Sequence, residues 1–577
     1  MNVSAGRWRR FAVKLARHAA WVLPGARSPW ADAMRRELDY LEDDAAALRW
    51  ALGCVAASYK TRLASPLPTL PRMRGRVGRV AGWRHAATSG VLMLFIGFAL
   101  LENAGGQTEP PRPVFKETTC DLPNVSPDIR PRLRCGTVSV PRDYDNPDAG
   151  HFKLAVVVIK SEQQPSWPEP VVYINGGPGS PLTVYAAYQA RTPYAPRRDL
   201  ILVDQRGTGR SEPNICPDLE RKLLDANFAI GATVTEEGLD RRQAAYLACR
   251  DQAIGRGLDL RNFGTRVTVE DFERVRQAFR VERWNVYGES YGTTVAMTLV
   301  ALYPDTVRSA VLDSIYPPDP VPLWSTIVSD ARDAFFAHCA RDKVCSTSFS
   351  DLAQTYRDTL ARLDQNPLVV TLPPQMRQAD DRVRITASLF EVGVSNLLYY
   401  PNAYPTLPRM IQSVHDGDAH GLESDLASQL TAAATQNLAT HAAVECRDRP
   451  HFRAQLPVGA SVLDRKQLYG VCGHWSEPGP QPLVPVGTPV PTLVLAGQFD
   501  PVARPASSRH VAQLIGASAR FVEFPFIGHN VRRFSPCGAR IAADFIDHPA
   551  QAPDTSCADR IAPIRFLPRI PDAPRDR

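Results

Sequence analysis

The segment Gly288-Glu289-Ser290-Tyr291-Gly292 constrains the fold of this chain more than any other. It directly follows the apolar run at 284–287 and directly precedes an apolar stretch of helical composition at 293–302. A serine on a tight turn between a strand and a helix needs small flanking residues, because larger side chains would clash there. Such a turn lifts the hydroxyl above the sheet edge and aims the helix N-terminus at developing negative charge. The segment therefore predicts a nucleophile, Ser290, on an α/β scaffold.

Other apolar, β-branched runs alternate with helical stretches on both sides of this turn. Candidate strands lie at 154–159, 171–174, 200–203, 284–287, 310–312, 492–495 and 521–523. Unbroken apolar strands that alternate with helices are typical of a parallel sheet covered on both faces. The stretch 314–489 lacks this alternation and is rich in Leu, Ala and Pro, so we expect an inserted, mainly helical cap. The predicted class is α/β, with the core divided between 115–313 and 490–570.

A serine nucleophile needs a base and an acid, which on this scaffold follow the serine in the order acid, histidine. Asp500 comes just after the candidate strand 492–495, and His529 just after 521–523. Both would lie beyond strand ends at one sheet edge, where ligands bind. The acid would orient the imidazole, which takes the serine proton. Asp313, after another candidate strand, is the alternative acid.

Backbone N–H groups must stabilise the oxyanion that such a reaction forms. The loop Asn175-Gly176-Gly177-Pro178-Gly179 follows the candidate strand 171–174, where this scaffold carries one donor. We predict the N–H groups of Gly177 and Tyr291 as donors. The run 204–211 superficially resembles a phosphate loop but lacks the Gly-Lys-Ser/Thr ending, so we expect a structural turn and no nucleotide. We predict no cofactor, and no zinc-type Cys/His spacing appears.

The formal net charge of +7 is unevenly distributed along the chain. Residues 1–85 hold 16 Lys and Arg against 6 Asp and Glu, whereas the remainder holds 51 against 54. This distribution argues against a nucleic-acid-binding body. Residues 86–101 are uncharged and follow five arginines, so we expect a single membrane anchor at 86–104, a basic helical cytoplasmic segment at 1–85, and an extracytoplasmic body. The alternative is a cleaved signal peptide starting at Met73, which would give a secreted protein.

Ten of the eleven cysteines follow the predicted anchor, an even number that an oxidising compartment favours. Nearest neighbours along the chain would pair as 120–135, 216–249, 339–345, 446–472 and 537–557. The sequence leaves this connectivity open, and reduced thiols in a cytosol are the alternative.

Together, these motifs resemble the α/β-hydrolase serine peptidases of the prolyl aminopeptidase and tripeptidyl aminopeptidase group. The resemblance runs over roughly 115–570 and is carried by NGGPGS, VDQRGTGRSE, YGESYGTT, PTLVLAGQFDPV and FIGHN. It implies an α/β-hydrolase fold, a TAP-like C-terminal domain, and an exported exopeptidase with Ser290, Asp500 and His529 as its triad. Many prolyl aminopeptidases have His in place of Asn175 and Trp in place of Tyr291, which argues against a strict proline preference.

An aminopeptidase must also bind a substrate ammonium, and a partly desolvated carboxylate suits that task. The resemblance points to an acidic residue near a cap cysteine, within AVECRD at 443–448. Asp448 is the first candidate, followed by Glu445 and Glu289; a salt bridge within the cap is the alternative.

The sequence thus predicts a serine hydrolase, most specifically an exopeptidase that acts on short peptides through an acyl-enzyme. One alternative is an extracytoplasmic esterase or lactone hydrolase that uses the same triad. Another is a catalytically inactive, membrane-tethered binding protein. The expected partners are a peptide substrate and the membrane, without nucleic acid, and we make no prediction of oligomeric state.

Overall fold

The computed structural model describes residues 112–228, 236–316, 323–371, 382–419, 422 and 436–569, together with 15, 51–52 and 54–55. The chain divides into two units, Met1–Gln107 and Thr108–Arg577, and the second carries the architecture described below. The predicted anchor at 86–104 and almost all of the basic segment 1–85 lie outside the described residues. In the part of the chain that the structure describes, no helix combines the length and the apolar character that a membrane crossing requires.

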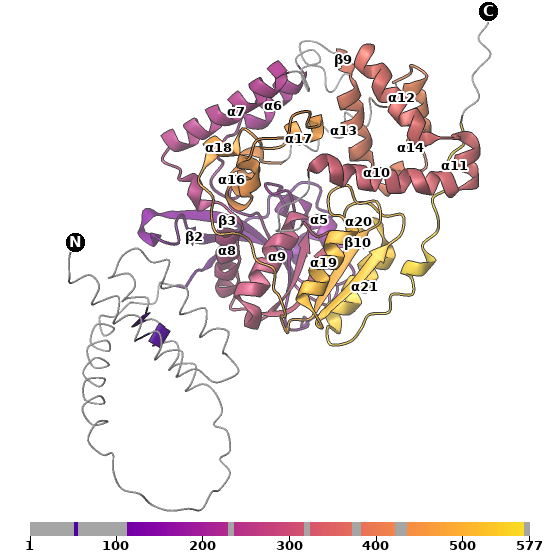
Figure 1. Ribbon diagram of the computed structural model, residues 1–577. Coiled ribbons are helices and arrows are strands. Elements are labelled where there is room, and N and C mark those ends of the chain that lie inside the picture. The colour runs from indigo at the N-terminus through magenta and orange to yellow at the C-terminus, as the bar shows by residue number, and fades with distance from the viewer. Residues whose placement is uncertain are drawn as a thin grey trace, which may run out of the picture. The chain divides into compact units, whose positions relative to one another are not determined.

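A nine-stranded mixed sheet runs through the described part of the second unit (Figure 1). In spatial order its strands are β1 (Phe115–Thr118), β2 (Leu133–Pro141), β3 (His151–Ile159), β5 (Leu200–Val203), β4 (Val171–Ile174), β6 (Trp284–Glu289), β7 (Val307–Asp313), β10 (Thr492–Gly497) and β11 (Ala519–Phe524). The strands from β5 to β11 are parallel, as the sequence predicted. β1, β2 and β3 pair antiparallel, and β3 is also antiparallel to β5.

The expectation of a wholly parallel sheet is therefore wrong at the β3 end. β3 is joined to β2 and to β4 by short connections that contain no α-helix. A parallel neighbour needs a crossover of a dozen or more residues, whereas a short connection reverses the chain direction. β1 and β2 were not among the predicted strands, because exposed and buried residues mix along them instead of forming an apolar run.

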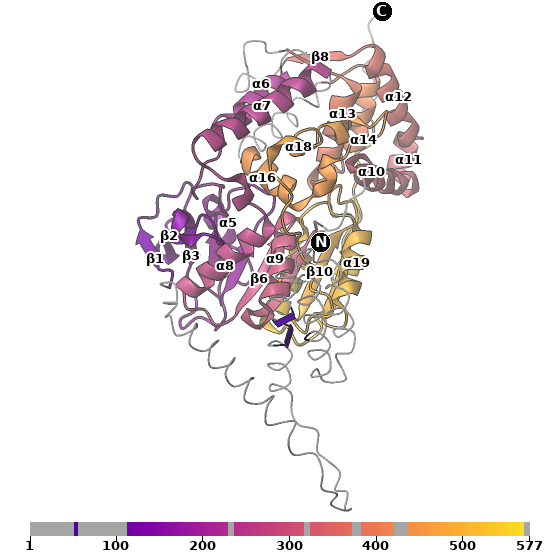
Figure 2. The ribbon, with the colours of Figure 1, turned by 60° about the vertical axis from the view of Figure 1, so that its left-hand side comes forward.

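β4 shows why the central strands are unbroken apolar runs in the sequence. Val172 and Ile174 belong to one buried cluster, together with helices α8 (Thr265–Ala278), α9 (Tyr291–Leu302) and α19 (Pro505–Ile515). Val171 and Tyr173 belong to a second cluster, together with α5 (Ala186–Gln189) and α21 (Pro536–Asp547). Successive side chains point to opposite faces, so a strand with helices on both faces must be apolar at every position. Figure 2 shows α8 and α9 alongside the sheet.

Between β7 and β10 the chain forms a mainly helical insertion, as the composition of this stretch suggested. Its elements are α10 (Trp324–Arg341), α11 (Lys343–Ser348), α12 (Leu352–Gln365), β8 (Leu368–Thr371), β9 (Arg382–Ile385), α13 (Ala387–Leu397), α14 (Leu407–His415), α16 (Leu438–Asp448), α17 (Val462–Arg465) and α18 (Cys472–Trp475). Helices α10 to α14 enclose an apolar cluster of their own, around Phe335 and Phe390.

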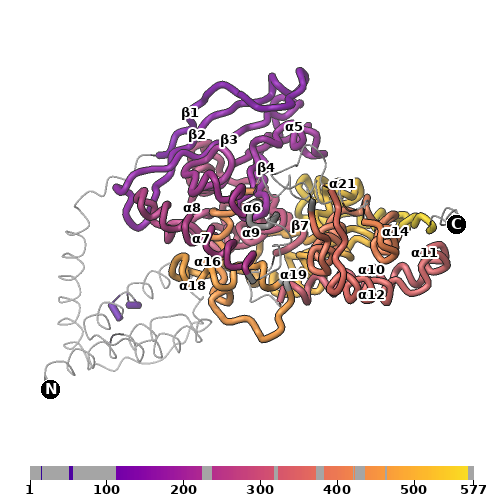
Figure 3. The backbone as a smooth tube through the Cα atoms, turned by 90° about the horizontal axis from the view of Figure 1, so that it is seen from above, coloured from indigo at the N-terminus to yellow at the C-terminus, as the bar shows by residue number. Residues whose placement is uncertain are grey.

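A second helical insertion was not predicted from the sequence. It lies between β5 and β6 and consists of α6 (Leu219–Phe228) and α7 (Glu236–Gly255). These helices contact α16 and α18, which come from the other insertion. Figures 1 and 3 therefore show two groups of helices over the sheet: a first group of α6, α7, α16 and α18, and a second group of α10 to α14.

Five disulfides cross-link the described part of the second unit. The pairs are Cys120–Cys135, Cys216–Cys249, Cys339–Cys345, Cys446–Cys472 and Cys537–Cys557, the nearest-neighbour arrangement that the sequence left open.

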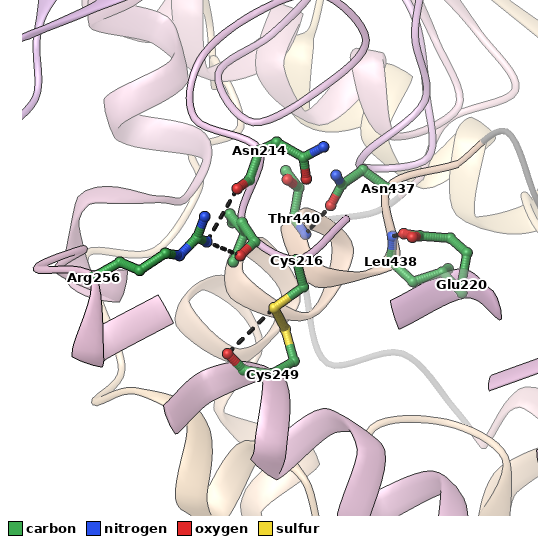
Figure 4. The surroundings of a disulfide bond; sticks show 9 residues. Asn214, Cys216, Glu220, Cys249, Arg256, Asn437, Leu438 and Thr440 are labelled. Atoms are coloured by element: carbon green, nitrogen blue, oxygen red, sulfur yellow. Dashed lines mark hydrogen bonds between the residues drawn. A yellow bond between two sulfur atoms is a disulfide. The ribbon is translucent and has the colours of Figure 1, made fainter. Parts of the chain in front are cut away.

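One of these disulfides holds the first helix group together (Figure 4). Cys216, just before α6, is bonded to Cys249 of α7. Beside it, the N–H of Leu438 at the start of α16 donates to Glu220 Oε1 of α6 at 2.7 Å. The disulfide and this hydrogen bond fix α7 and α16 against the same short helix.

Candidate active site

Ser290 stands between β6 and α9 with φ 55° and ψ −127°. For a residue with a side chain, this backbone conformation costs about 1–3 kcal/mol and persists only when its surroundings enforce it. The Thr293 N–H and Oγ1 do so by donating to the Ser290 carbonyl, at 2.8 and 2.6 Å. A Cβ on Gly292 would lie 2.0 Å from the Ile174 carbonyl oxygen, so only glycine fits there. The turn has the geometry expected of a nucleophile turn.

His529 and Asp500 form a hydrogen-bonded pair, as predicted. The Nδ1 atom of His529 lies 3.0 and 2.9 Å from the two carboxylate oxygens of Asp500. Asp500 is 1% exposed, and its Oδ1 also accepts the N–H groups of Val502 and Ala503. This network holds the carboxylate toward the ring. Among the described residues, no hydrogen bond links Ser290 Oγ to His529. Catalytic hydrogen bonds are often long in the absence of substrate and tighten only when substrate binds.

The electrostatic surroundings of His529 favour its protonated form. Burial by itself would lower the pKa of His529. The charge and hydrogen bond of Asp500, with the charges of Glu289 and Asp313, outweigh burial and raise the pKa above its ordinary value. Such an imidazole readily accepts a proton from a nearby hydroxyl, as a general base must.

Asp313, the alternative acid, does not contact the histidine ring. Its carboxylate is fully buried and accepts the N–H groups of Val531 and Arg532 at 2.8 and 2.9 Å. It also accepts the Tyr287 hydroxyl at 2.8 Å, and its backbone carbonyl accepts the Ser290 N–H at 3.0 Å. Burial raises the pKa of Asp313, and these hydrogen bonds oppose that shift. Asp313 thus links the serine turn to the segment that follows His529.

The predicted oxyanion loop lies against the nucleophile. A Cβ on Gly176 would be 2.6 Å from the Ser290 Cβ and 3.0 Å from its Oγ, so the loop backbone passes directly beside the hydroxyl. Gly177, with φ +120°, adopts a conformation that favours glycine. The Asn175 side chain donates to the Ser180 carbonyl at 2.9 Å, which closes the loop. The two predicted donors thus flank the serine: Gly177 follows Gly176 in this loop, and Tyr291 is the first residue of α9.

The run 204–211 acts as a structural turn, as expected. The Gln205 side chain donates to the Asn175 carbonyl at 3.1 Å and so supports the oxyanion loop. Arg206 is buried and donates through Nε to the Asp271 carboxylate at 2.7 Å. Its guanidinium is therefore paired inside the protein rather than presented to a phosphate.

The three candidate ligands for the substrate ammonium differ in the burial and in the partners of their carboxylates. Asp448 is 4% exposed, and its Oδ2 accepts the N–H and hydroxyl of Thr265 at 2.9 and 2.5 Å. Burial raises its pKa to about 7. Glu445 is 1% exposed and pairs with Arg449 at 3.1 Å, which is the salt bridge that the sequence left as the alternative. Both carboxylates therefore already have partners within the protein.

Glu289 is the carboxylate next to the nucleophile. It is half-buried, and burial raises its pKa, whereas the charge of Arg532 lowers it. Among the described residues its carboxylate forms no hydrogen bond or ion pair. Glu289 is therefore the one of the three candidates without a partner in the described protein.

Two residues beside the site were not predicted from the sequence. The Tyr399 ring meets the His529 ring edge-on, with centroids 5.3 Å apart. The Arg532 guanidinium lies over Tyr173 at 4.7 Å and donates to its hydroxyl at 2.9 Å. Tyr399 comes from the β7–β10 insertion, so no local pattern could place it here. Among the described residues, no group of three His, Cys, Asp or Glu side chains could hold a metal ion.

Known proteins similar to this chain include two curated relatives and a solved structure. The chain is 28% identical over 361 residues to the tripeptidyl aminopeptidase of Streptomyces coelicolor, an alignment that covers 58% of this chain and 62% of that relative. It is 25% identical over 463 residues to the serine protease Hip1 of Mycobacterium tuberculosis, which covers 72% and 86%. A proline iminopeptidase structure from Mycobacterium smegmatis aligns with 72% of this chain and 98% of its own, at 16% identity and a TM-score of 0.38.

The chain thus spans less than two thirds of the length of the Streptomyces relative. The alpha/beta hydrolase fold family matches residues 169–532, which are more than half of the 577 residues. This match includes the serine turn, the oxyanion loop, Asp500 and His529. The chain belongs to the alpha/beta hydrolase fold family.

Proposed function

We propose that this protein is an extracytoplasmic serine exopeptidase, of aminopeptidase or tripeptidyl aminopeptidase type, that cleaves short peptides from their free N-terminus. The observation that carries the proposal is the hydrogen-bonded pair of His529 and Asp500 on the sheet edge that bears the strained turn of Ser290. Relatives named tripeptidyl aminopeptidase and serine protease favour peptides over other acyl compounds as the substrate class.

The residues support a two-step reaction. Ser290 Oγ attacks the scissile carbonyl carbon while His529 takes the hydroxyl proton, and Asp500 stabilises the imidazolium. The N–H groups of Gly177 and Tyr291 donate to the oxyanion. His529 then protonates the leaving amine, which departs and leaves an acyl-enzyme. A water that His529 deprotonates hydrolyses the acyl-enzyme and regenerates the serine hydroxyl.

The helical insertion at 314–489 serves as a cap in this proposal. The Asn437 N–H at the start of α16 donates to the Gly179 carbonyl at 2.8 Å. The Gln436 side chain donates to the Pro178 carbonyl at 2.7 Å. The insertion therefore contacts the oxyanion loop itself, and a site covered in this way favours short peptides over folded proteins.

Glu289 is our candidate ligand for the substrate ammonium, because Asp448 and Glu445 are engaged within the protein. The body lies outside the cytoplasm in this proposal, because five disulfides favour an oxidising compartment. An anchor at 86–104 tethers it to the membrane, and cleavage of that segment would give a secreted form.

The test is hydrolysis of aminoacyl and tripeptidyl chromogenic amides by the full chain. Ser290→Ala should abolish turnover, whereas Ser556→Ala, at an exposed serine, should leave it unchanged. N-acetylation of the substrates should also abolish cleavage. Activity that survives in Ser290→Ala would refute the nucleophile. Ester hydrolysis without any amide cleavage would instead support the esterase alternative.

A further inference from the structure

A cavity of about 250 Å³ lies between the two groups of helices. The first group contributes Arg242 of α7 and His441 of α16, and the second group contributes Trp324 of α10 and Ser395 of α13. The segment 466–468, just after α17, completes the lining. Ligand pockets commonly measure about 300–1,000 Å³, so this cavity suits a small part of a substrate rather than a long peptide.

Two of the lining residues connect the cavity to the catalytic groups. Tyr399 lines it, and the ring of Tyr399 meets the His529 ring with centroids 5.3 Å apart. Gln436 lines it and donates to the Pro178 carbonyl in the oxyanion loop at 2.7 Å. The cavity therefore adjoins residues that contact the catalytic histidine and the oxyanion loop.

The charges on the cavity wall are all of one sign. Arg242 and Lys466 line it, and none of its described lining residues is Asp or Glu. The Arg242 guanidinium lies 5.4 Å from the centre of the Tyr246 ring and donates to the Lys466 carbonyl at 3.3 Å, so its polar contact is with a neutral group. Within the described protein, the ammonium of Lys466 forms no ion pair or hydrogen bond.

The charge of Arg242 disfavours the protonated form of Lys466. Burial, and then the charge of Arg242, lower the pKa of Lys466 to about 8. Burial also lowers the pKa of His441, which favours its neutral form, although the charge of Glu445 opposes the shift. Buried charges in proteins are normally paired, so an uncompensated pair of cations that faces a cavity fits an anionic ligand.

We propose that this cavity is a subsite for a carboxylate of the peptide substrate, which Arg242 and Lys466 bind. The inference rests on the proposed peptidase function and specifies its substrates as short peptides that carry a carboxylate a few bonds from the scissile amide. The carboxylate is either the α-carboxylate at the peptide's C-terminus or an acidic side chain. In both cases, the distance from the cavity to Ser290 determines how far the carboxylate lies from the scissile bond of the peptide.

The experiment measures hydrolysis of three peptides by the full chain. The first peptide has a C-terminal carboxylate, and the second is the same peptide as its C-terminal amide. The third is a C-terminal amide that carries one acidic side chain, and the other side chains of all three are neutral. The free acid should have a higher kcat/KM than the amide, mainly through KM. Lys466→Met and Arg242→Met should remove that preference by lowering kcat/KM about 30-fold or more for the acid. The same two substitutions should change kcat/KM for the neutral amide by less than about twofold. Preference for the third peptide would identify the side chain as the source.

Two control variants separate the subsite from general damage. Arg241→Met removes the neighbouring cation on α7, which is exposed and pairs with Glu237, and should leave the preference intact. Lys466→Arg keeps the positive charge and should retain the preference. Equal kcat/KM for all three peptides in the unmodified protein, or an equal loss for all peptides in Lys466→Met, would overturn the proposal.

The subsite can also be tested without turnover. Calorimetric titration of Ser290→Ala with the acid and the amide should show tighter binding of the acid, and Lys466→Met added to Ser290→Ala should abolish the difference. Equal binding of the free acid, the amide and the amide with an acidic side chain refutes the subsite. Tighter binding of the acid without hydrolysis by the unmodified protein refutes the peptidase function and leaves the subsite standing.

Discussion

At the scale of single residues, Asp313 and Asp500 are buried carboxylates at the ends of neighbouring parallel strands, and they contact different parts of one segment. Asp500 meets the ring of His529, whereas Asp313 accepts backbone N–H groups two and three residues further on. Asp500 therefore contributes most to the charge of the imidazole through direct contact, whereas Asp313 fixes the path of the chain that carries it.

The pH dependence of activity should reflect the first of these contacts. His529 must be neutral to act as a base, and its pKa is raised, so kcat/KM should fall as pH decreases through a value above the ordinary 6.5 of histidine. Asp500→Asn removes the charge that raises this pKa, so it should move the acidic limb to lower pH. It should also reduce kcat by about 10⁴-fold. The check is a pH–rate profile; an unshifted limb would contradict the pairing.

Asp313→Asn tests the second contact. An amide offers one acceptor oxygen where the carboxylate offers two, so at least one buried donor among Tyr287, Val531 and Arg532 loses its partner. We expect a loss of about 1–3 kcal/mol in the free energy of unfolding. We also expect kcat to fall while KM changes little. Asp313 contacts both the serine turn and the segment after His529, so the substitution should displace the catalytic groups. Urea unfolding and steady-state kinetics measure both effects.

The control for Asp313→Asn is Asp305→Asn, at an exposed carboxylate shortly before β7. It should leave both stability and kcat unchanged. A loss of stability in Asp313→Asn with full kcat would mean that Asp313 does not position the catalytic groups.

At the scale of elements, α16 joins the helical insertion to the core. The Asp448 carboxylate at its end accepts the N–H and hydroxyl of Thr265 at the start of α8, which are 183 residues away in the chain. The Thr265 hydroxyl in turn lies 2.9 Å from that of Tyr291, the residue after the nucleophile. A buried chain of hydrogen bonds thus runs from α16 to the first residue of α9.

The stability of this contact should depend on pH. Burial raises the pKa of Asp448 to about 7, above its value of about 3.9 in an unfolded chain. The folded state therefore binds the proton more tightly, and this contribution to stability is present at low pH and lost as pH rises from about 4 to about 7. Asp448→Asn should flatten that part of the dependence. Urea unfolding at several pH values tests this, and an unchanged slope would contradict it.

At the scale of the whole molecule, the helices above the sheet come from two separate insertions that disulfides brace internally. Cys216–Cys249 fastens α7, which carries Arg242, to the segment before α6. Cys446–Cys472 joins α16 to α18 within the same helix group. Cys537–Cys557 instead joins α21 to the C-terminal segment, away from the residues that line the cavity.

Removing the first disulfide should therefore affect substrate choice as well as stability. The double variant Cys216→Ser/Cys249→Ser should lose about 2–4 kcal/mol of unfolding free energy and part of the preference for a peptide carboxylate. Cys537→Ser/Cys557→Ser should lose stability of the same order and keep the preference. Denaturant unfolding, with the acid and amide peptides as substrates, distinguishes the two. Equal effects of both variants on the preference would contradict this view.

Local signals in the sequence determined much of the core and of the candidate site. A strand with helices on both faces must be apolar throughout, so β4, β5, β6 and β10 stand out as short apolar runs. Ser290 and Asp500 follow β6 and β10, and His529 follows β11, which was predicted at 521–523, so their common sheet edge followed from position alone. β1 and β2 lack a continuous apolar run, and they were missed for that reason.

Long-range packing decided the rest. Asp313 and Asp500 look alike in the sequence, and the geometry of two adjacent loops pairs His529 with only one of them. Asp448 is bound by Thr265, 183 residues away, through a contact that no local pattern encodes, whereas Glu445 pairs with Arg449 one turn further along its own helix. Arg242 and Lys466 face one cavity although 224 residues separate them. Sequence periodicity reports which face of a segment is buried, whereas the partner of each buried group is set only when distant segments pack together.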